Sequence, residues 1–287
     1  MGPTVYPDQN VLIYLYEESG KSGVFENKLN KAIGDGRFKI ILSPWHWVET
    51  AQTQNLGKAL PLAGFMDRLQ PNWLRDRRHL STTEVDTKFF QLVGIPYVPL
   101  EAIVTKAELL TEMNGFQVTQ DRAPSSVEFV DGWIKNPNLM IPVIESYKKN
   151  MQALISLREA ISVGMLTPDM LKAGDRQYIE RHLPNTTPNG VLLDAATKNA
   201  FLDRVTQNDF PTLAIESEIA EYSWANRGRV DWNSMIDKFH VISSVHYADI
   251  VVSDDRFIHL LLPAAQKTGY VKATVAKFKQ FCRQFLP

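Results

Sequence analysis

The sequence lacks several features that would place it in a specialised class of protein. Its 287 residues include one cysteine, Cys282, which excludes an internal disulfide and a cysteine-rich zinc site. No apolar run approaches the roughly 20 residues that span a bilayer. The residues after Met1 show no basic segment followed by an apolar one, so no secretory signal is expected. These absences predict a globular, cytoplasmic protein with no membrane segment.

An excess of charge of one sign is also missing. Lysine and arginine number 31 against 32 acidic residues, for a formal net charge of −1. Proteins that coat nucleic acid through bulk electrostatics are usually strongly basic, so such coating is not expected.

Two local clusters of cations depart from this average. No acid follows Asp255, whereas six cations do: Arg256, Lys267, Lys272, Lys277, Lys279 and Arg283. Four arginines surround Asn72-Trp73-Leu74: Arg68, Arg75, Arg77 and Arg78. Either cluster could follow a phosphate backbone, and either could equally be the solvated face of a helix.

Both ends of the chain alternate between strand and helix signals. Val5–Pro7 reads as a short strand that runs into a helix. The β-branched run Phe38–Leu42 stops at Ser43 and Pro44, which are typical of a helix start. Near the other end, Asp249–Val252 has the composition of a buried strand between two helices. This alternation predicts an α/β fold with a mostly parallel central sheet.

The middle of the chain has a different pattern, with helical periodicity and almost no strand signal. Helices are expected over 101–113, 126–135, 141–163, 168–182 and 190–205. The economical interpretation is one α/β core built from 1–59 and 208–287, with a large all-α insertion over 60–207. A weak strand over Tyr270–Lys272 and a final helix over 275–285 should complete the core.

Four acidic residues are expected at one edge of this sheet, where open parallel sheets carry their sites. Asp8 follows the first strand, and Glu49 lies about two turns into the helix after the second. Asp255 follows the strand near the C-terminus, and Asp237 lies in the helix that leads into that strand. Four converging carboxylates repel one another unless a cation neutralises them, and carboxylates suit Mg²⁺ or Mn²⁺. The pattern predicts a divalent-metal site able to support phosphodiester hydrolysis.

Three segments resemble the motifs of the PIN-domain nuclease family. Tyr6–Leu15 (YPDQNVLIYL) is similar to the opening strand, Asp-x-Asn and helix. Ile41–Glu49 (ILSPWHWVE) is similar to the second motif, a strand and Ser followed by a helical Glu. Asp237–Asp255 (DKFHVISSVHYADIVVSDD) is similar to the third and fourth motifs with their spacing intact. One departure is Pro7, which stands where the family usually has an aliphatic residue.

The resemblance implies a three-layer PIN-like fold and an endoribonuclease acting on single-stranded RNA rather than DNA. It assigns metal binding and catalysis to Asp8, Glu49, Asp237 and Asp255. It assigns supporting roles to Asn10, Ser253 and Asp254. Flanking phosphates would then contact basic residues: Arg75, Arg77, Arg78, Lys272, Lys277 and Lys279.

Ordinary roles compete with these assignments. Asp8 and Asp255 each stand where a helix begins, and a carboxylate there is a good cap. His240 and His246 fit packing or hydrogen bonding better than metal binding. Joint placement at one edge is what favours a site over these separate roles.

Other residues near the motifs are expected to be structural. Trp45 and Trp47, which flank the Glu49 turn, fit a core better than a platform for base stacking. Arg78 and Glu84 border the insertion and could reach the mouth of the site.

Two other functions stay open at this point. The first is a non-catalytic PIN-like scaffold that binds RNA or protein through the insertion. The second is the toxin of a toxin–antitoxin pair, with an antitoxin as its partner. A homo-oligomer is compatible with all three.

Overall fold

A six-stranded sheet forms the centre of the molecule, with the strand order β4-β3-β2-β1-β5-β6. The computed structural model describes residues 2–114, 117–139, 145, 149, 152–153, 156, 159–160, 162–165, 168–225, 232–254 and 256–286. The strands are β1 (Thr4–Pro7), β2 (Lys39–Leu42), β3 (Asn72–Leu74), β4 (Ile103–Val104), β5 (Ile250–Val252) and β6 (Thr274–Ala276). Neighbouring strands are parallel except for β3 and β4. The predicted α/β class with a mostly parallel sheet is confirmed.

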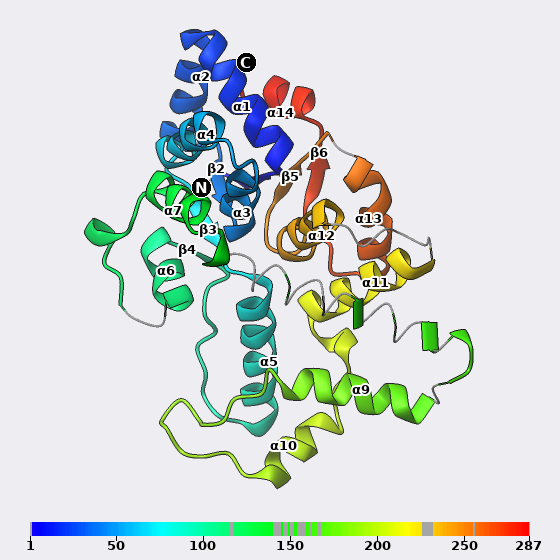
Figure 1. Ribbon diagram of the computed structural model, residues 1–287. Coiled ribbons are helices and arrows are strands. Elements are labelled where there is room, and N and C mark those ends of the chain that lie inside the picture. The colour runs from blue at the N-terminus through cyan, green and yellow to red at the C-terminus, as the bar shows by residue number, and fades with distance from the viewer. Residues whose placement is uncertain are drawn as a thin grey trace.

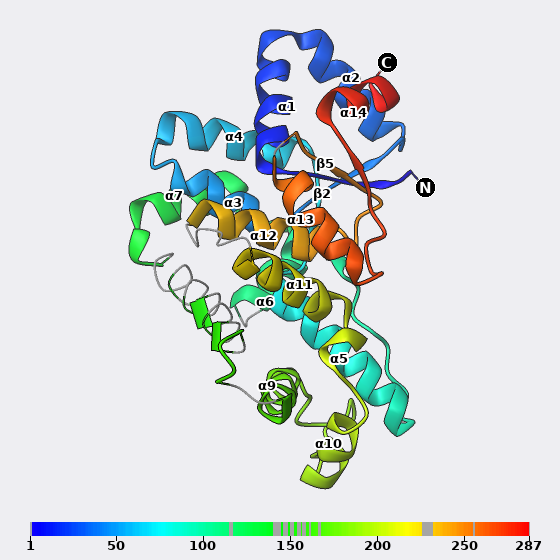
Figure 2. The same ribbon diagram turned by 90° about the vertical axis from the view of Figure 1, so that its right-hand side faces the viewer.

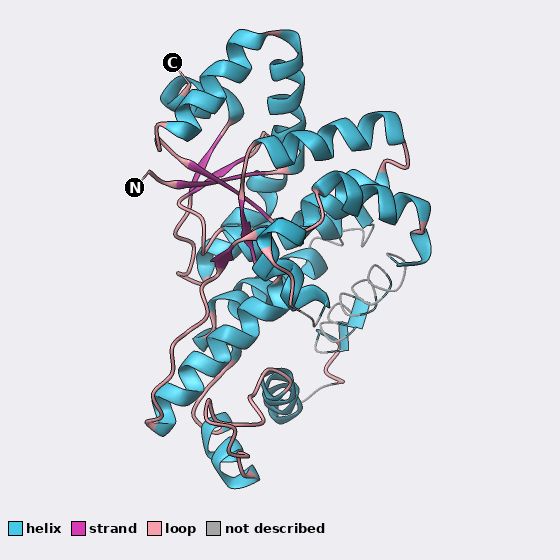
Figure 3. Cartoon of the chain, turned by 90° about the vertical axis from the view of Figure 1, so that its left-hand side faces the viewer, coloured by secondary structure: helices cyan, strands magenta, loops and turns pink. Residues whose placement is uncertain are grey.

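Helices cover both faces of the sheet, which gives three layers (Figure 3). Alternate strand residues point to opposite faces, so Ile40 and Leu42 enter one core and Ile41 the other. Against the first face lie α1 (Gln9–Lys21), α2 (Gly23–Gly34), α4 (Leu56–Arg68), α6 (Lys106–Asn114), α7 (Ser126–Lys135) and α14 (Phe278–Phe285). Against the second lie α11 (Pro211–Ala225), α12 (Trp232–Ser244) and α13 (Arg256–Lys267). We call this three-layer part the body.

Helix α3 (Pro44–Gln52) contributes to both cores of the body. Its Trp47 and Ala51 pack into the first core, whereas Trp45 and Val48 pack into the second. The helix begins with Ser43 as N-cap and Pro44 at its first position, as the sequence predicts. Helix α3 therefore lies at the carboxyl edge of the sheet and contacts both layers.

A smaller group of helices extends from the body, and we call it the lobe (Figures 1 and 2). It contains most of α5 (Arg77–Val93), α9 (Pro168–Glu180), α10 (Ala195–Leu202) and the start of α11. A third core holds it together, with Phe89, Phe201 and Phe210 among its buried residues. Helix α5 belongs to both parts, because Leu80 near its start packs into the body.

The segment 60–207 departs from the predicted all-α insertion in two ways. It supplies β3 and β4 to the central sheet, and α4, α6 and α7 pack on a face of that sheet. Strands of two or three residues are too short to show an alternating pattern, which is why the sequence did not reveal them. The short 3-10 helices are η1 (Gln120–Arg122), η2 (Pro137–Leu139) and η3 (Gln207–Asp209).

The helices expected over 101–113 and 190–205 are present but begin five residues later, at Lys106 and Ala195, and the helix expected over 275–285 begins at Phe278. The helix expected over 126–135 has those bounds in α7. The weak strand expected at Tyr270–Lys272 lies instead at Thr274–Ala276, next to β5. Most of the helix expected over 141–163 lies outside the described residues. Among the helices that are described, none has the length and apolar character needed to cross a bilayer.

Candidate functional site at the carboxyl edge of the sheet

The carboxyl ends of β2, β1 and β5 lie side by side, because these strands are parallel neighbours. Chain order reverses around β1, and such switch points form crevices in open α/β sheets. The backbone N–H of Asp8 donates to the carbonyl of Val252 over 2.9 Å. Asp8 therefore lies at this edge with Ser43 on the β2 side and Ser253 on the β5 side.

Asp8 is the N-cap of α1 as well as an edge residue. Its Oδ1 accepts a hydrogen bond of 2.7 Å from the N–H of Val11, and the residue is 7% exposed. The capping role that competes with a functional one is thus present. Asn10 lies in the first turn of α1 and is exposed, whereas Ser253 is buried.

Glu49 is held by a histidine from the other end of the chain. The Nε2 of His240 donates to Glu49 Oε2 over 2.7 Å, and the two residues are 191 positions apart. His240 is buried, and the Glu49 side chain is 20% exposed. Asp237 precedes His240 by three residues on α12, and such pairs share one side of a helix. Asp237 therefore lies on the side of α12 that carries the contact with Glu49.

Tyr6 connects this pair to the strand ends. Its hydroxyl lies 2.8 Å from Ser43 Oγ and is hydrogen-bonded to Nδ1 of His240. Burial raises the pKa of Tyr6 well above its usual value, and the carboxylates of Glu49 and Asp8 act in the same direction against the hydrogen bond from Ser43. The phenol is therefore protonated, and both acids lie near enough to influence it.

His46 fixes the backbone next to Asp8. Its Nδ1 accepts from the N–H of Ser43 over 3.0 Å, and its Nε2 donates to the carbonyl of Pro7 over 2.9 Å. Burial, together with the neighbouring His240, lowers the pKa of His46 to about 3. Burial also lowers the pKa of His240 to about 3, so both imidazoles are neutral near pH 7.

Of the two acids expected after β5, the structure describes one. Asp254 is exposed, and its Oδ1 accepts from the N–H of Phe278 at the start of α14 over 3.1 Å. Asp255 lies outside the described residues.

The donor chemistry of this edge suits a hard divalent cation, because it consists of carboxylate and hydroxyl oxygens. Asp8, Glu49 and Asp237 do not form a complete ligand set by themselves. Within the described part of the chain, no group of three or more His, Cys, Asp or Glu side chains is placed to hold a metal ion.

Two arginines that were expected to contact nucleic acid are structural in this fold. Arg75 is 6% exposed, forms an ion pair with Glu112 and donates to the carbonyl of Glu101 over 2.6 Å. Arg77 forms an ion pair with Glu216, and its guanidinium lies 5.6 Å from the ring centre of Phe239. These cations bind acids within the protein, and their partners are too distant in the sequence to be recognised there.

The remaining basic candidates are on the surface. Arg78, Lys272, Lys277 and Lys279 are exposed. Lys272 Nζ lies 3.2 Å from Nε2 of His246, a histidine that also bonds the carbonyl of Tyr270. Lys277 and Lys279 flank the contact between Asp254 and α14, next to Ser253 at the end of β5.

Three further expectations can be compared with the structure. Trp45 and Trp47 are core residues, as predicted, and are 3% and 0% exposed. Glu84 does not reach the acidic edge, because it accepts hydrogen bonds from Thr212 and Tyr247.

Sequence reasoning missed Tyr6, Ser43, His46 and His240 as members of the site. Tyr6 and Ser43 could have been found, because they stand beside the ends of two adjacent strands. The roles of the histidines depend on how α3 and α12 are rotated against each other, which the sequence does not specify.

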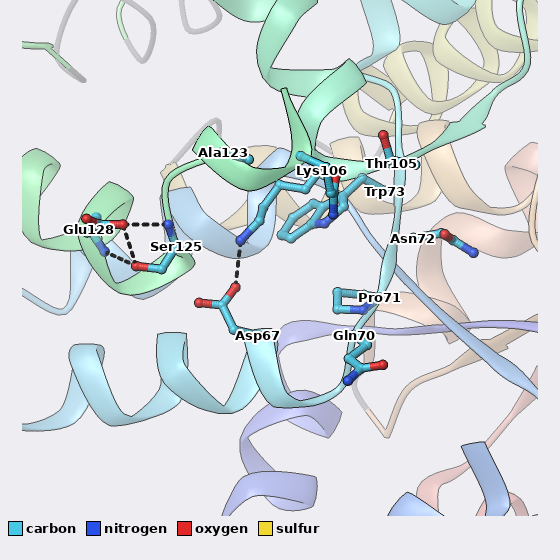
Figure 4. Close-up of a pocket in the computed structure, with 11 residues that line it drawn as sticks. Asp67, Gln70, Pro71, Asn72, Trp73, Thr105, Lys106, Ala123, Ser125 and Glu128 are labelled. Atoms are coloured by element: carbon cyan, nitrogen blue, oxygen red, sulfur yellow. Dashed lines mark hydrogen bonds and ion pairs between the residues drawn. The ribbon is translucent and has the colours of Figure 1, made fainter. Parts of the chain in front are cut away.

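A separate pocket of about 560 Å³ lies at the opposite edge, near the start of β3 (Figure 4). In this pocket, Lys106 Nζ lies 2.9 Å from Asp67 Oδ1. The Asp67 carboxylate also accepts hydrogen bonds from the N–H and the hydroxyl of Ser126. Glu128 accepts from Ser125 as a helix cap. These groups connect α4, α6 and α7, so the pocket has a structural explanation.

Comparison of the chain with models of known protein families, with curated proteins and with solved structures finds no match. The PIN-like relationship therefore stays a prediction from the motifs.

Proposed function

We propose that the protein is a nuclease dependent on Mg²⁺ or Mn²⁺ that hydrolyses phosphodiester bonds of single-stranded RNA. The observation that carries the proposal is the contact between His240 and Glu49, which joins the two ends of the chain over 191 residues. This contact supports the proposal because it binds Glu49 to α12, the helix that also carries Asp237. Asp255, three residues after Val252 at the end of β5, would complete the acidic set.

Different residues of the proposed site would bind the cation and the substrate. Asp8, Glu49, Asp237 and Asp255 would hold the cation, which when bound neutralises developing charge and lowers the pKa of a water. The bond from Val11 fixes Asp8, and the bond from His240 fixes Glu49. Lys277 and Lys279, exposed next to the end of β5, would hold flanking phosphates of the substrate.

A non-catalytic scaffold that binds RNA or protein is the second candidate. It is favoured by one observation, the lack of a metal-binding group among the described His, Cys, Asp and Glu residues. A scaffold would bind RNA without cutting it, and metal would not change the products. The toxin of a toxin–antitoxin pair is a special case of the nuclease proposal.

The test is cleavage of a labelled single-stranded RNA with Mn²⁺, with Mg²⁺, and with EDTA, using a DNA of the same sequence for comparison. Asp8→Asn and Asp255→Asn are each expected to lower the rate at least about a hundredfold, because each removes a charge needed to hold the cation. Asp35→Asn, an exposed acid at the end of α2, is the matched control and should cleave like the wild type. Binding without metal-dependent cleavage would favour the scaffold.

A further inference from the structure

Four buried or half-buried side chains form a continuous hydrogen-bonded series: Ser43, Tyr6, His240 and Glu49. For a neutral imidazole, one arrangement of protons fits every contact in the series. A carboxylate can only accept, so His240 donates to Glu49 from Nε2. With Nδ1 unprotonated, the phenol of Tyr6 donates to it, and the Tyr6 oxygen then accepts from the hydroxyl of Ser43. The hydrogen bonds then run in one direction, from Ser43 just after β2 to Glu49.

We infer that His240 is the positioning residue for Glu49, with its tautomer and ring orientation set by Tyr6 and Ser43. This inference rests on the proposed function, because it gives Glu49 a task that needs a fixed carboxylate. Groups that orient a ligand carboxylate or imidazole in this way commonly change metal affinity or activity by 10–100-fold when removed.

The same group of residues also reaches Asp8. The N–H of Ser43 donates to His46 Nδ1, which leaves the proton on Nε2 for the carbonyl of Pro7. Pro7 directly precedes Asp8, whose own N–H is bound to Val252. One connected group of residues that begins at Ser43 therefore binds Glu49 directly and the backbone next to Asp8.

A purely structural role does not require this arrangement. The neighbours of His240 on α12, including Phe239, Val241 and Ile242, are buried apolar residues of the second core. An apolar residue at position 240 could continue that packing without the cost of burying polar groups. The imidazole adds what an apolar residue could not, a donor aimed at Glu49.

The first experiment replaces the histidine in two ways in the full chain. His240→Leu keeps apolar volume and removes the donor, whereas His240→Gln offers an amide N–H near the place of Nε2. In the RNA cleavage assay, His240→Leu should lower kcat about 10–100-fold with little change in KM, and His240→Gln should recover much of this loss. His246→Leu, which changes a half-buried histidine bonded to a backbone carbonyl, should match the wild type.

Equal loss in the Leu and Gln variants, in proportion to a lowered melting temperature, would show a structural role and overturn the inference. So would wild-type kcat in a folded His240→Leu variant.

A second measurement does not depend on activity. In ¹⁵N-histidine NMR spectra of the metal-free protein, His240 should show a protonated Nε2 and an unprotonated Nδ1. Glu49→Gln should shift the Nε2 signal of His240, and Tyr6→Phe should shift Nδ1, while the signals of His246 stay in place. A protonated Nδ1, or a His240 signal indifferent to Glu49→Gln, contradicts the inference. If the wild type cuts no RNA, the proposed function fails, and the spectra still decide whether His240 orients Glu49.

Discussion

The body and the lobe differ in how some of their buried ionisable groups are satisfied. In the body, the buried histidines at positions 46 and 240 have hydrogen-bond partners at both ring nitrogens. In the lobe, Asp86 Oδ1 is buried without a partner among the described atoms, and burial raises the pKa of Asp86 to about 6. A sheet with fixed register can hold side chains in defined positions, whereas the lobe depends on one small apolar core. Buried polar atoms without a partner among the described residues also occur in the body, at Gln9 and Ser243 for example, so the difference lies in these ionisable groups.

The largest expected effect tests whether the two parts unfold together. Trp47→Ala should lower the free energy of unfolding by about 3–5 kcal/mol, because Trp47 is fully buried, packs on Trp73 and donates to Ser126. Phe89→Ala in the lobe should cost about 3 kcal/mol, and the loss should be confined to the lobe. Urea unfolding measures the first change, and hydrogen exchange of the amides measures where the second one acts. If Phe89→Ala speeds exchange in β1 and β2 as much as in α9 and α10, the two parts are one cooperative unit.

The second prediction concerns the connection between the two parts. Arg77 joins α5 to α11 through Glu216 and to α9 through the hydroxyl of Tyr178 over 3.2 Å. Arg77→Ala should destabilise the protein by about 3 kcal/mol, because it leaves a buried carboxylate without its cation. The double variant Arg77→Met with Glu216→Leu should recover much of that loss.

The control for this prediction is Arg78→Ala. Arg78 is exposed, and its replacement should change stability by no more than about 0.5 kcal/mol. Equal effects at positions 77 and 78 would contradict a connecting role for Arg77.

The smallest expected effect depends on pH and uses the unpartnered acid of the lobe. The pKa of Asp86 is raised from 3.8 to about 6 by burial, so ionisation disfavours the folded state. The loss of folding stability caused by ionised Asp86 is absent below the unfolded pKa. It grows between about pH 4 and pH 6 and is complete above that range. Asp86→Asn should therefore stabilise the protein at pH 7.5 by about 1 kcal/mol, a figure reduced for partial exposure, with no gain at pH 4.

Thermal melting of wild type and Asp86→Asn across pH 4–8 checks this window. Asp203→Asn, an exposed acid of the lobe, should show no comparable trend. A gain from Asp86→Asn that is constant across the range would contradict the assigned pKa.

Strand ends were the most predictable part of the molecule. The β-branched runs that became β1, β2 and β5, each followed by a polar or helix-starting residue, were sufficient to predict the parallel sheet and the edge that carries Asp8. Helix α3 was predictable because Ser43 and Pro44 specify its start. Strands β3 and β4 were not, since so few residues show no periodicity and depend on neighbouring strands for their pairing.

The candidate site was predictable only for groups that stand beside strand ends. The sequence does not reveal which acid pairs with a given cation. Arg75 and Arg77 were therefore predicted to contact nucleic acid, whereas in the structure they form ion pairs with Glu112 and Glu216. His240 was read as a packing or hydrogen-bonding residue, and its hydrogen bonds agree with that interpretation. Its partner, Glu49, is set by the packing of α12 on α3, which local pattern does not encode.

Proline at position 7 is unusual in a central strand, because it has no N–H to give to a neighbour. β1 pairs with β5 as far as Pro7 and Val252, whereas its register with β2 is formed at Thr4 and Val5. The N–H and C=O of one strand residue point to the same side. Since the carbonyl of Pro7 meets His46 from α3, the missing N–H also faces that side.

The pairing of β1 with β2 can therefore end after Val5 without leaving an unpaired N–H at position 7. An ordinary residue at position 7 would present an N–H to the space that the His46 ring fills, and that N–H would need an acceptor there. Proline has no N–H and so needs no acceptor there. The His46 ring instead bridges the carbonyl of Pro7 and the N–H of Ser43, at the ends of β1 and β2. Pro7, the unusual residue of the opening motif, is therefore matched to the imidazole that lies beside Asp8 at the sheet edge.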